Sequence, residues 1–88
     1  MVEAIYCYDT ASVRFAVYQD GRRIVADIAE HALRDVFGAR GGSDSLLESY
    51  RQNAEAIGAQ ALERHHAAPG ARILLETADF IPSPVTVF

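Results

Sequence analysis

Three segments of alternating apolar and polar residues open the chain and predict three β-strands. They span residues 2–8, 12–19 and 22–28. Side chains of a strand point alternately to opposite faces, so this alternation gathers the apolar side chains on one face of a sheet. Asp20-Gly21 separates the second and third segments, and this pair favours the tight two-residue turn of a β-hairpin. We therefore predict an antiparallel hairpin over residues 12–28.

The apolar spacing then changes from every second residue to every third or fourth, which is the period of an α-helix. Residues 29–37 form the first such stretch, although Ala29 stands where a polar capping residue is usual. Gly38 is placed to end this helix in the left-handed conformation that glycine adopts readily. A flexible loop is expected to follow over residues 38–43.

A second helix is predicted from Ser45 to about His66, before Pro69-Gly70 ends any continuation. Ser45 and Glu48 match a capping box at its start, and Asp44 is an alternative cap. At about 1.5 Å per residue this helix would be roughly 33 Å long, whereas a seven-residue strand covers only about 23 Å. A helix of this length must overhang the sheet, bend, or pack part of its apolar stripe elsewhere.

Small residues form a notch in the middle of this second helix, at Ala54, Gly58 and Ala61. Glycine inside a helix costs about 1 kcal/mol relative to alanine, so its presence there indicates the close approach of another backbone. Either a segment of the same chain or a second subunit can cross at the notch. In both cases we expect the notch to be buried.

The last predicted strand covers residues 71–78, where Ile73-Leu74-Leu75 is an apolar run that suggests burial on both faces. The terminal stretch 79–88 ends in Val85-Thr86-Val87-Phe88, which fits a short edge strand or an apolar arm. No linker or repeat divides the chain, so we predict a single domain over residues 1–88.

The predicted order is β-β-β-α-α-β, with strands and helices in separate runs. This order favours an α+β fold, with an antiparallel sheet of about four strands and two helices packed on one face.

Composition limits the classes of function. Half of the 88 residues are hydrophobic, yet no apolar run approaches the roughly 20 residues of a membrane span, so no membrane association is expected. The formal charge of −4 disfavours binding to the phosphate backbone of nucleic acids. The chain opens without a basic segment and an apolar segment in succession, so no secretory signal is visible and a cytoplasmic location is expected.

No catalytic residue, metal site or cofactor emerges from the sequence. Cys7 is the only cysteine and is more typical of a small buried hydrophobic residue than of a nucleophile. His65 and His66 are adjacent, so on a helix they point about 100° apart, whereas two metal ligands need a spacing of four. The glycine-rich loop over residues 38–43 lacks the Gly-Lys-Ser/Thr ending of a phosphate-binding loop.

The leading functional hypothesis is a non-enzymatic interaction module, whose biological process the sequence leaves unknown. Its partner would be a second copy, giving a homodimer, or an unidentified protein. The candidate contact residues are Ala54, Gly58, Ala61, Val85, Val87 and Phe88.

A second hypothesis is a small-ligand or nucleic-acid binder that uses the hairpin. Basic side chains interleaved with an aromatic one can bind single-stranded nucleic acid by stacking. The candidate residues are Arg14, Tyr18, Arg22 and Arg23. Asp20 and Asp27 dilute this basic patch, which therefore also fits an ordinary solvated edge.

Several short runs, taken in order, resemble a family of small bacterial proteins catalogued as domain of unknown function 1488. The resemblance covers roughly residues 9 to 80 and leaves the terminal extension outside. It implies a compact α+β fold in a bacterial cytoplasm and transfers no catalytic residue, because the family has no established activity. The runs are Val13-Arg14-Phe15, Asp20-Gly21, Ala32-Leu33 with Phe37-Gly38-Ala39, Leu46 with Tyr50-Arg51 and Ile57, and residues 73–80.

Overall fold

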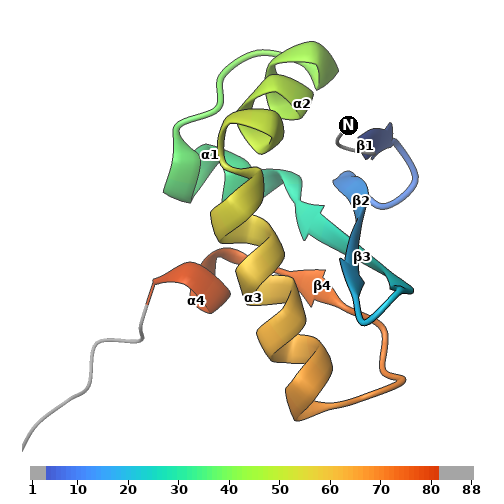
Figure 1. Cartoon of the computed structure of the whole chain (residues 1–88). Helices are drawn as coiled ribbons and strands as arrows, with labels where there is room; N and C mark the ends of the chain where they lie inside the picture. The colour runs from blue at the N-terminus through green and yellow to red at the C-terminus, as the bar shows by residue number, and fades with distance from the viewer. Residues whose placement is uncertain (1–3, 82–88) are drawn as a thin grey trace, which may run out of the picture.

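A four-stranded sheet with the order β1-β2-β3-β4 forms one layer of the protein in a computed structural model, which describes residues 4–81 (Figure 1). The strands are β1 (Ala4–Cys7), β2 (Ser12–Gln19), β3 (Arg22–Ala29) and β4 (Leu74–Leu75). β2 pairs antiparallel with both β1 and β3, as predicted, but β4 runs parallel to β3. The sheet is therefore mixed, and the prediction of a purely antiparallel sheet was wrong. The α+β class is confirmed.

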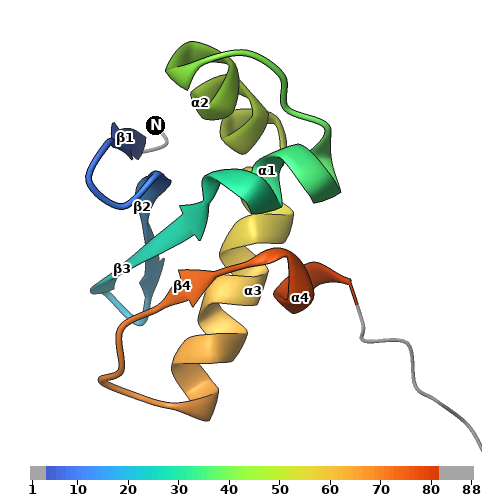
Figure 2. The ribbon, with the colours of Figure 1, turned by 180° about the vertical axis from the view of Figure 1, so that it is seen from behind.

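Helices lie against one face of this sheet. They are α1 (Glu30–Phe37), α2 (Ser43–Gln52), α3 (Ala54–Ala67) and the short α4 (Thr77–Phe80). α3 passes in front of β4 in Figure 1 and behind β4 in Figure 2, which views the molecule from the other side. Within residues 4–81, no helix covers the opposite face of the strands.

The core lies between the sheet and the helices. Alternate residues of β2 and β3 supply one side of it, because every second side chain of a strand points the same way. Phe15 of β2 stacks at a tilt on Tyr50 of α2, with ring centroids 4.9 Å apart. The largest fully buried core side chains are Tyr50, Phe15, Ile28, Leu33, Leu46, Ile57, Leu75 and Val13.

The hairpin follows its sequence signal closely. Gln19 pairs with Arg22 across the turn, and both turn residues adopt positive φ, 52° at Asp20 and 79° at Gly21. Gly38 likewise ends α1 in the left-handed conformation, with φ 73°. Both predictions are confirmed.

The single long second helix was a wrong prediction, because Asn53 divides it into α2 and α3. Asn53 has φ −120° and ψ 19°, outside the helical range. Its side-chain amide donates to the carbonyl of Ser49 at 2.8 Å, and its own N–H donates to the carbonyl of Tyr50 at 3.0 Å. Asparagine offers the backbone such alternatives to regular helix bonds, and here they interrupt the helix. The predicted mismatch in length between helix and sheet does not arise, because the helix is interrupted at Asn53.

The predicted capping box at the start of this helix was also wrong. α2 begins at Ser43, with Gly42 at the cap position and no side-chain cap. The Ser45 hydroxyl instead accepts from the backbone N–H of Arg40 at 3.3 Å, so it fastens the preceding loop to the helix.

The C-terminal strand is much shorter than predicted. β4 pairs with only Asp27 and Ile28 of β3, and the chain then turns into α4. The backbone N–H of Glu76 donates to the Asp79 carboxylate at 2.7 Å, which stabilises the start of that helix. Leu75 is fully buried but Leu74 is exposed on the opposite face, so the expectation of burial on both faces fails.

Of the terminal stretch 79–88, the structure describes only residues 79–81, so the expected strand or arm over residues 85–88 stays a prediction. Asp79 and Phe80 belong to α4, and Phe80 packs edge-to-face on Phe37 of α1 with centroids 5.2 Å apart. Residues 82–88, which include Val85, Val87 and Phe88, lie outside the described residues.

The small-residue notch of α3 faces the sheet of its own chain. Gly58 and Ala61 are buried, and Ala54 is half-buried against the core. A Cβ atom at Gly58 would lie 3.1 Å from Cγ1 of Val17, which is closer than ordinary van der Waals contact. Glycine therefore permits the close approach of α3 to β2.

A hydrogen-bond network joins β1 to α1 and to the loop before α2. The Tyr6 hydroxyl donates to Glu30 Oε1 at 2.7 Å, and Arg34 Nη2 donates to Glu30 Oε2 at 3.0 Å and to the carbonyl of Gly41 at 2.8 Å. The bond from Tyr6, followed by that from Arg34, holds the pKa of Glu30 below its ordinary value. The Tyr6 pKa is raised for the same reason, since its neutral hydroxyl donates to the carboxylate.

Replacing Gly58 by leucine is predicted to destabilise the fold. A bulky side chain overfills the close crossing with Val17, at a cost of about 1–3 kcal/mol in the free energy of unfolding. Urea denaturation measures this. Ala59→Leu, on the exposed side of the same helix, is the matched control and should change stability by no more than about 0.5 kcal/mol. Equal stability of the two variants would contradict the close crossing.

Glu30→Gln is predicted to lower the free energy of unfolding at pH 7. Because the pKa of Glu30 is lower in the folded protein than its ordinary 4.5, the carboxylate stabilises the fold above that pH. This contribution is lost as the pH falls through the folded-state pKa, so the difference between the wild type and the variant should shrink towards pH 3. Urea denaturation at both pH values measures it, with exposed Glu63→Gln as control. A difference that is independent of pH would argue against the network.

Candidate docking face of the sheet

Alternate residues of the strands point away from the helices and form what we call the open face. Residues directly opposite each other in paired strands share a face, so the register defines its members. Ile5 lies opposite Arg14, Arg14 opposite Asp27, and Asp27 opposite Leu74. The open face consists of Ile5, Arg14, Ala16, Tyr18, Arg23, Val25, Asp27 and Leu74, and the same register continues it at the β1–β2 end through Cys7, Ser12 and Ala29.

The open face exposes more apolar surface than a solvated sheet face normally does. Ile5 is 60% exposed, Tyr18 57%, Val25 43% and Leu74 37%. An antiparallel sheet with one face in water usually carries polar residues there. Apolar side chains gathered in this way on a surface are characteristic of contact sites for other molecules.

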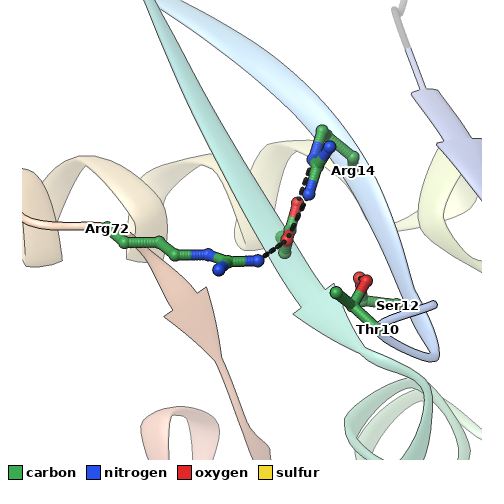
Figure 3. Close-up of polar contacts among 5 residues, drawn as sticks. Thr10, Ser12, Arg14 and Arg72 are labelled. Atoms are coloured by element: carbon green, nitrogen blue, oxygen red, sulfur yellow. Dashed lines mark hydrogen bonds and ion pairs between the residues drawn. The ribbon is translucent and has the colours of Figure 1, made fainter. Parts of the chain in front are cut away.

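A buried carboxylate lies near the centre of this face and is held by two arginines, as Figure 3 shows. Only 4% of the Asp27 side chain is exposed. Arg14 donates to it twice, from Nε to Oδ1 at 2.8 Å and from Nη2 to Oδ2 at 3.2 Å. Arg72 reaches it from the opposite side, with Nη2 at 3.4 Å from Oδ2. We call these three residues the arginine–carboxylate triad.

The triad gives the centre of the open face a net positive charge. The hydrogen bonds and the charge of Asp27 raise the pKa of Arg14 further above its ordinary value, so the Arg14 guanidinium stays charged. Arg14 and Arg72 carry two positive charges against the one negative charge of Asp27, whereas the whole chain carries −4. The triad therefore has the opposite sign to the net charge of the chain.

Two shallow hollows adjoin each other on the open face. The first, of about 220 Å³, is lined by Ala4, Ile5, Arg14, Phe15, Ala16, Arg23 and Val25. The second, of about 270 Å³, is lined by Arg14, Val25, Ala26, Asp27, Arg72 and Ile73. Arg14 and Val25 line both, so the hollows are neighbours on one surface.

A polar pair closes the β1–β2 end of the sheet. Ser12 is fully buried, and its hydroxyl is hydrogen-bonded to that of Thr10 at 2.7 Å (Figure 3). This bond satisfies a buried polar group where the chain turns between the two strands.

The structure brings together three of the four basic and aromatic residues singled out from the sequence. Arg14, Tyr18 and Arg23 share the open face, and Tyr18 lies opposite Arg23. Arg22 points to the other face, because adjacent residues of a strand alternate. There it lines a separate hollow with Gln19, Asp20, Ile24, His65 and His66.

His66 and Cys7, which the sequence singled out, take part in the packing of the fold. His66 Nε2 lies 2.9 Å from Gln19 Oε1, which links the end of α3 to the hairpin. Cys7 is half-buried on β1. Over residues 4–81, no group of three or more histidine, cysteine or acidic side chains is arranged to hold a metal ion.

None of the helices described has the length and apolar character that crossing a bilayer requires.

Sequence reasoning missed part of this site. It treated Asp27 as a diluting charge and did not consider Arg72 or Val25. The alternation in β3 could have placed Val25 and Asp27 on one face with Arg14. Nothing local could have brought Arg72 to Asp27, from which it is 45 positions away.

Fold and site together define a small α+β domain with helices on one side of its sheet and an apolar, positively charged surface on the other. The chain belongs to the family described as protein of unknown function (DUF1488), whose model matches residues 3–75. The resemblance noted in the sequence is thereby confirmed, and the match includes all three members of the triad. No curated protein and no solved structure matches the chain.

The triad is predicted to be energetically coupled. Arg14→Gln leaves a buried carboxylate with only the longer contact to Arg72 and should lower the free energy of unfolding, by less than the loss of a fully buried ion pair because the Arg14 side chain is 41% exposed. A double-mutant cycle with Asp27→Asn should give a larger coupling energy than an exposed ion pair of the same chain gives.

The exposed Arg51–Glu48 pair of α2, 3.7 Å apart, provides the control cycle. Its coupling energy should be close to zero or a few tenths of a kcal/mol. If the two cycles give the same coupling energy, Asp27 does not hold Arg14 as described.

Proposed function

We propose that this protein is a non-enzymatic interaction module, which binds a partner protein on the open face of its sheet. The exposure of Ile5, Tyr18, Val25 and Leu74 around the buried Asp27 carboxylate is the observation that carries this proposal. Burying apolar surface drives most protein association, and the helices already bury the other side of the sheet. The open face is thus the part of the described molecule best suited to a partner.

The partner surface that fits this face is apolar with acidic groups among its contacts. Arg14 and Arg72 together outweigh the charge of Asp27 and give the centre of the face a net positive charge, and interfaces place opposite potentials against each other. A second copy docked face to face would instead bring two positive surfaces together. Charge complementarity therefore favours a different, acidic protein over a homodimer.

Nucleic acid is the alternative occupant of the same surface. Arg14, Tyr18 and Arg23 lie together, and a basic face with an aromatic side chain can stack single-stranded bases. Against it, Asp27 neutralises part of that charge and the chain as a whole is negative. We favour the protein partner for this reason.

The proposal places this encounter in a bacterial cytoplasm. The resemblance to a family of small bacterial proteins supports that setting.

Site-specific photocrosslinking tests the proposal. A photoreactive residue replaces Val25 on the open face in cells that produce the full chain, and Ala59 on the exposed side of α3 is the control position. We expect a discrete protein adduct from position 25 and not from position 59, and Ile5→Glu should abolish it. Mass spectrometry should map the crosslink to an acidic, apolar segment of the partner.

Two other outcomes would contradict the proposed partner. An adduct between two copies of this chain, with a dimer in sedimentation velocity, would identify a homodimer instead. An adduct to nucleic acid, with oligonucleotide binding that weakens steeply with salt, would favour the alternative occupant. Equal labelling from both positions would remove the open face as the docking surface.

A further inference from the structure

The two arginines of the triad differ in how firmly Asp27 holds them. Arg14 is fixed by two hydrogen bonds and its side chain is 41% exposed. Arg72 makes one long contact at 3.4 Å and its side chain is 69% exposed. The first guanidinium is therefore preorganised, while the second can turn towards a ligand with little loss of hydrogen bonding.

A single carboxylate cannot accept hydrogen bonds from all the N–H donors of two guanidinium groups. Each guanidinium has five N–H donors, and Asp27 receives two from Arg14 and one from Arg72. One negative charge between two positive ones leaves the triad with a net positive charge. Such an arrangement attracts a second anion to the outer side of the pair.

The walls of the adjoining hollow strengthen this attraction. Besides the triad, Val25, Ala26 and Ile73 line the 270 Å³ hollow, so apolar atoms flank the charged groups. Removing water from around a hydrogen-bonded ion pair raises its electrostatic strength. A ligand group that enters here meets two guanidiniums flanked by apolar atoms, and a docked partner would exclude water from around them.

We infer that an acidic side chain of the partner binds between Arg14 and Arg72 on the outer side of Asp27. This inference rests on the proposed function and names the group that the open face recognises. A carboxylate has two oxygens in one plane, which match the paired N–H donors of a guanidinium. Asp27 acts as a positioning residue, since it holds Arg14 where the partner carboxylate meets it.

The neighbouring hollow of about 220 Å³ indicates a second side chain that the ligand should carry. Its 220 Å³ lie over the small side chain of Ala16, between Ile5 and Val25, and it shares Arg14 with the charged hollow. An aliphatic side chain fits this apolar depression. The recognised segment therefore carries an aliphatic residue close to its acidic one.

Titration of the full chain with short peptides, followed by the NMR shifts of its backbone amides, tests this inference. The probes are N-acetylated, C-amidated octapeptides of glycine and serine that contain one glutamate and one leucine, separated by zero to three residues. We expect at least one spacing to shift amides of β2, β3 and β4, with binding that weakens as salt is added. Replacing glutamate by glutamine in that peptide should weaken binding about tenfold or more.

Variants of the protein locate the site. Arg72→Gln should weaken binding of the glutamate peptide about tenfold while leaving the glutamine peptide unaffected, and Arg72→Lys should recover only part of the loss. Arg72 is exposed and weakly bonded, so its variants should remain folded. Arg51→Gln, which removes an exposed arginine from α2, is the matched control and should bind like the wild type.

The outcomes separate this inference from the proposed function. Equal binding of glutamate and glutamine peptides, or no shift of open-face amides by any peptide, would overturn the carboxylate site. A partner crosslinked at Val25 would still stand in that case. Displacement of the peptide by a single-stranded oligonucleotide at lower concentration would overturn the inference in favour of a nucleic-acid phosphate.

Discussion

The register of the β2–β3 hairpin is the constraint on which the rest of the structure depends. The turn at Asp20-Gly21 fixes which residues of the two strands lie opposite each other, and a slip by one residue would exchange the two faces. With this register, Phe15 and Ile28 enter the core, while Arg14 and Asp27 meet on the outside. One local turn thus determines both the hydrophobic layer under the helices and the charged centre of the open face.

The sequence predicts the parts of the fold that depend on local interactions. Alternation and turn chemistry place the hairpin, and helical spacing with Gly38 places α1. The break at Asn53 was not predicted, because an asparagine inside an amphipathic pattern reads as an ordinary exposed position until its hydrogen bonds are seen. β4 was predicted too long, because only tertiary packing decides that two residues pair with β3 before the chain turns into α4.

The candidate site shows the same division. The face shared by Arg14, Tyr18 and Arg23 follows from alternation, and the same rule should have assigned Arg22 to the other side. The role of Asp27 depends on Arg72, which comes to it through the path of three helices and a parallel strand. Contacts between residues so far apart in sequence carry no local signal. The notch at Gly58 was recognised as a close crossing, but only the structure identifies Val17 as the side chain that meets it.

The separation of 45 positions between Arg72 and Asp27 has a consequence for when the site can exist. The hairpin and Arg14 can form early, from neighbouring segments, whereas Arg72 arrives only after the intervening helices have docked and the loop has closed. An incompletely synthesised or partly unfolded chain would present Asp27 with a single guanidinium. The proposed recognition through the pair of arginines would thereby be restricted to molecules whose folding has finished.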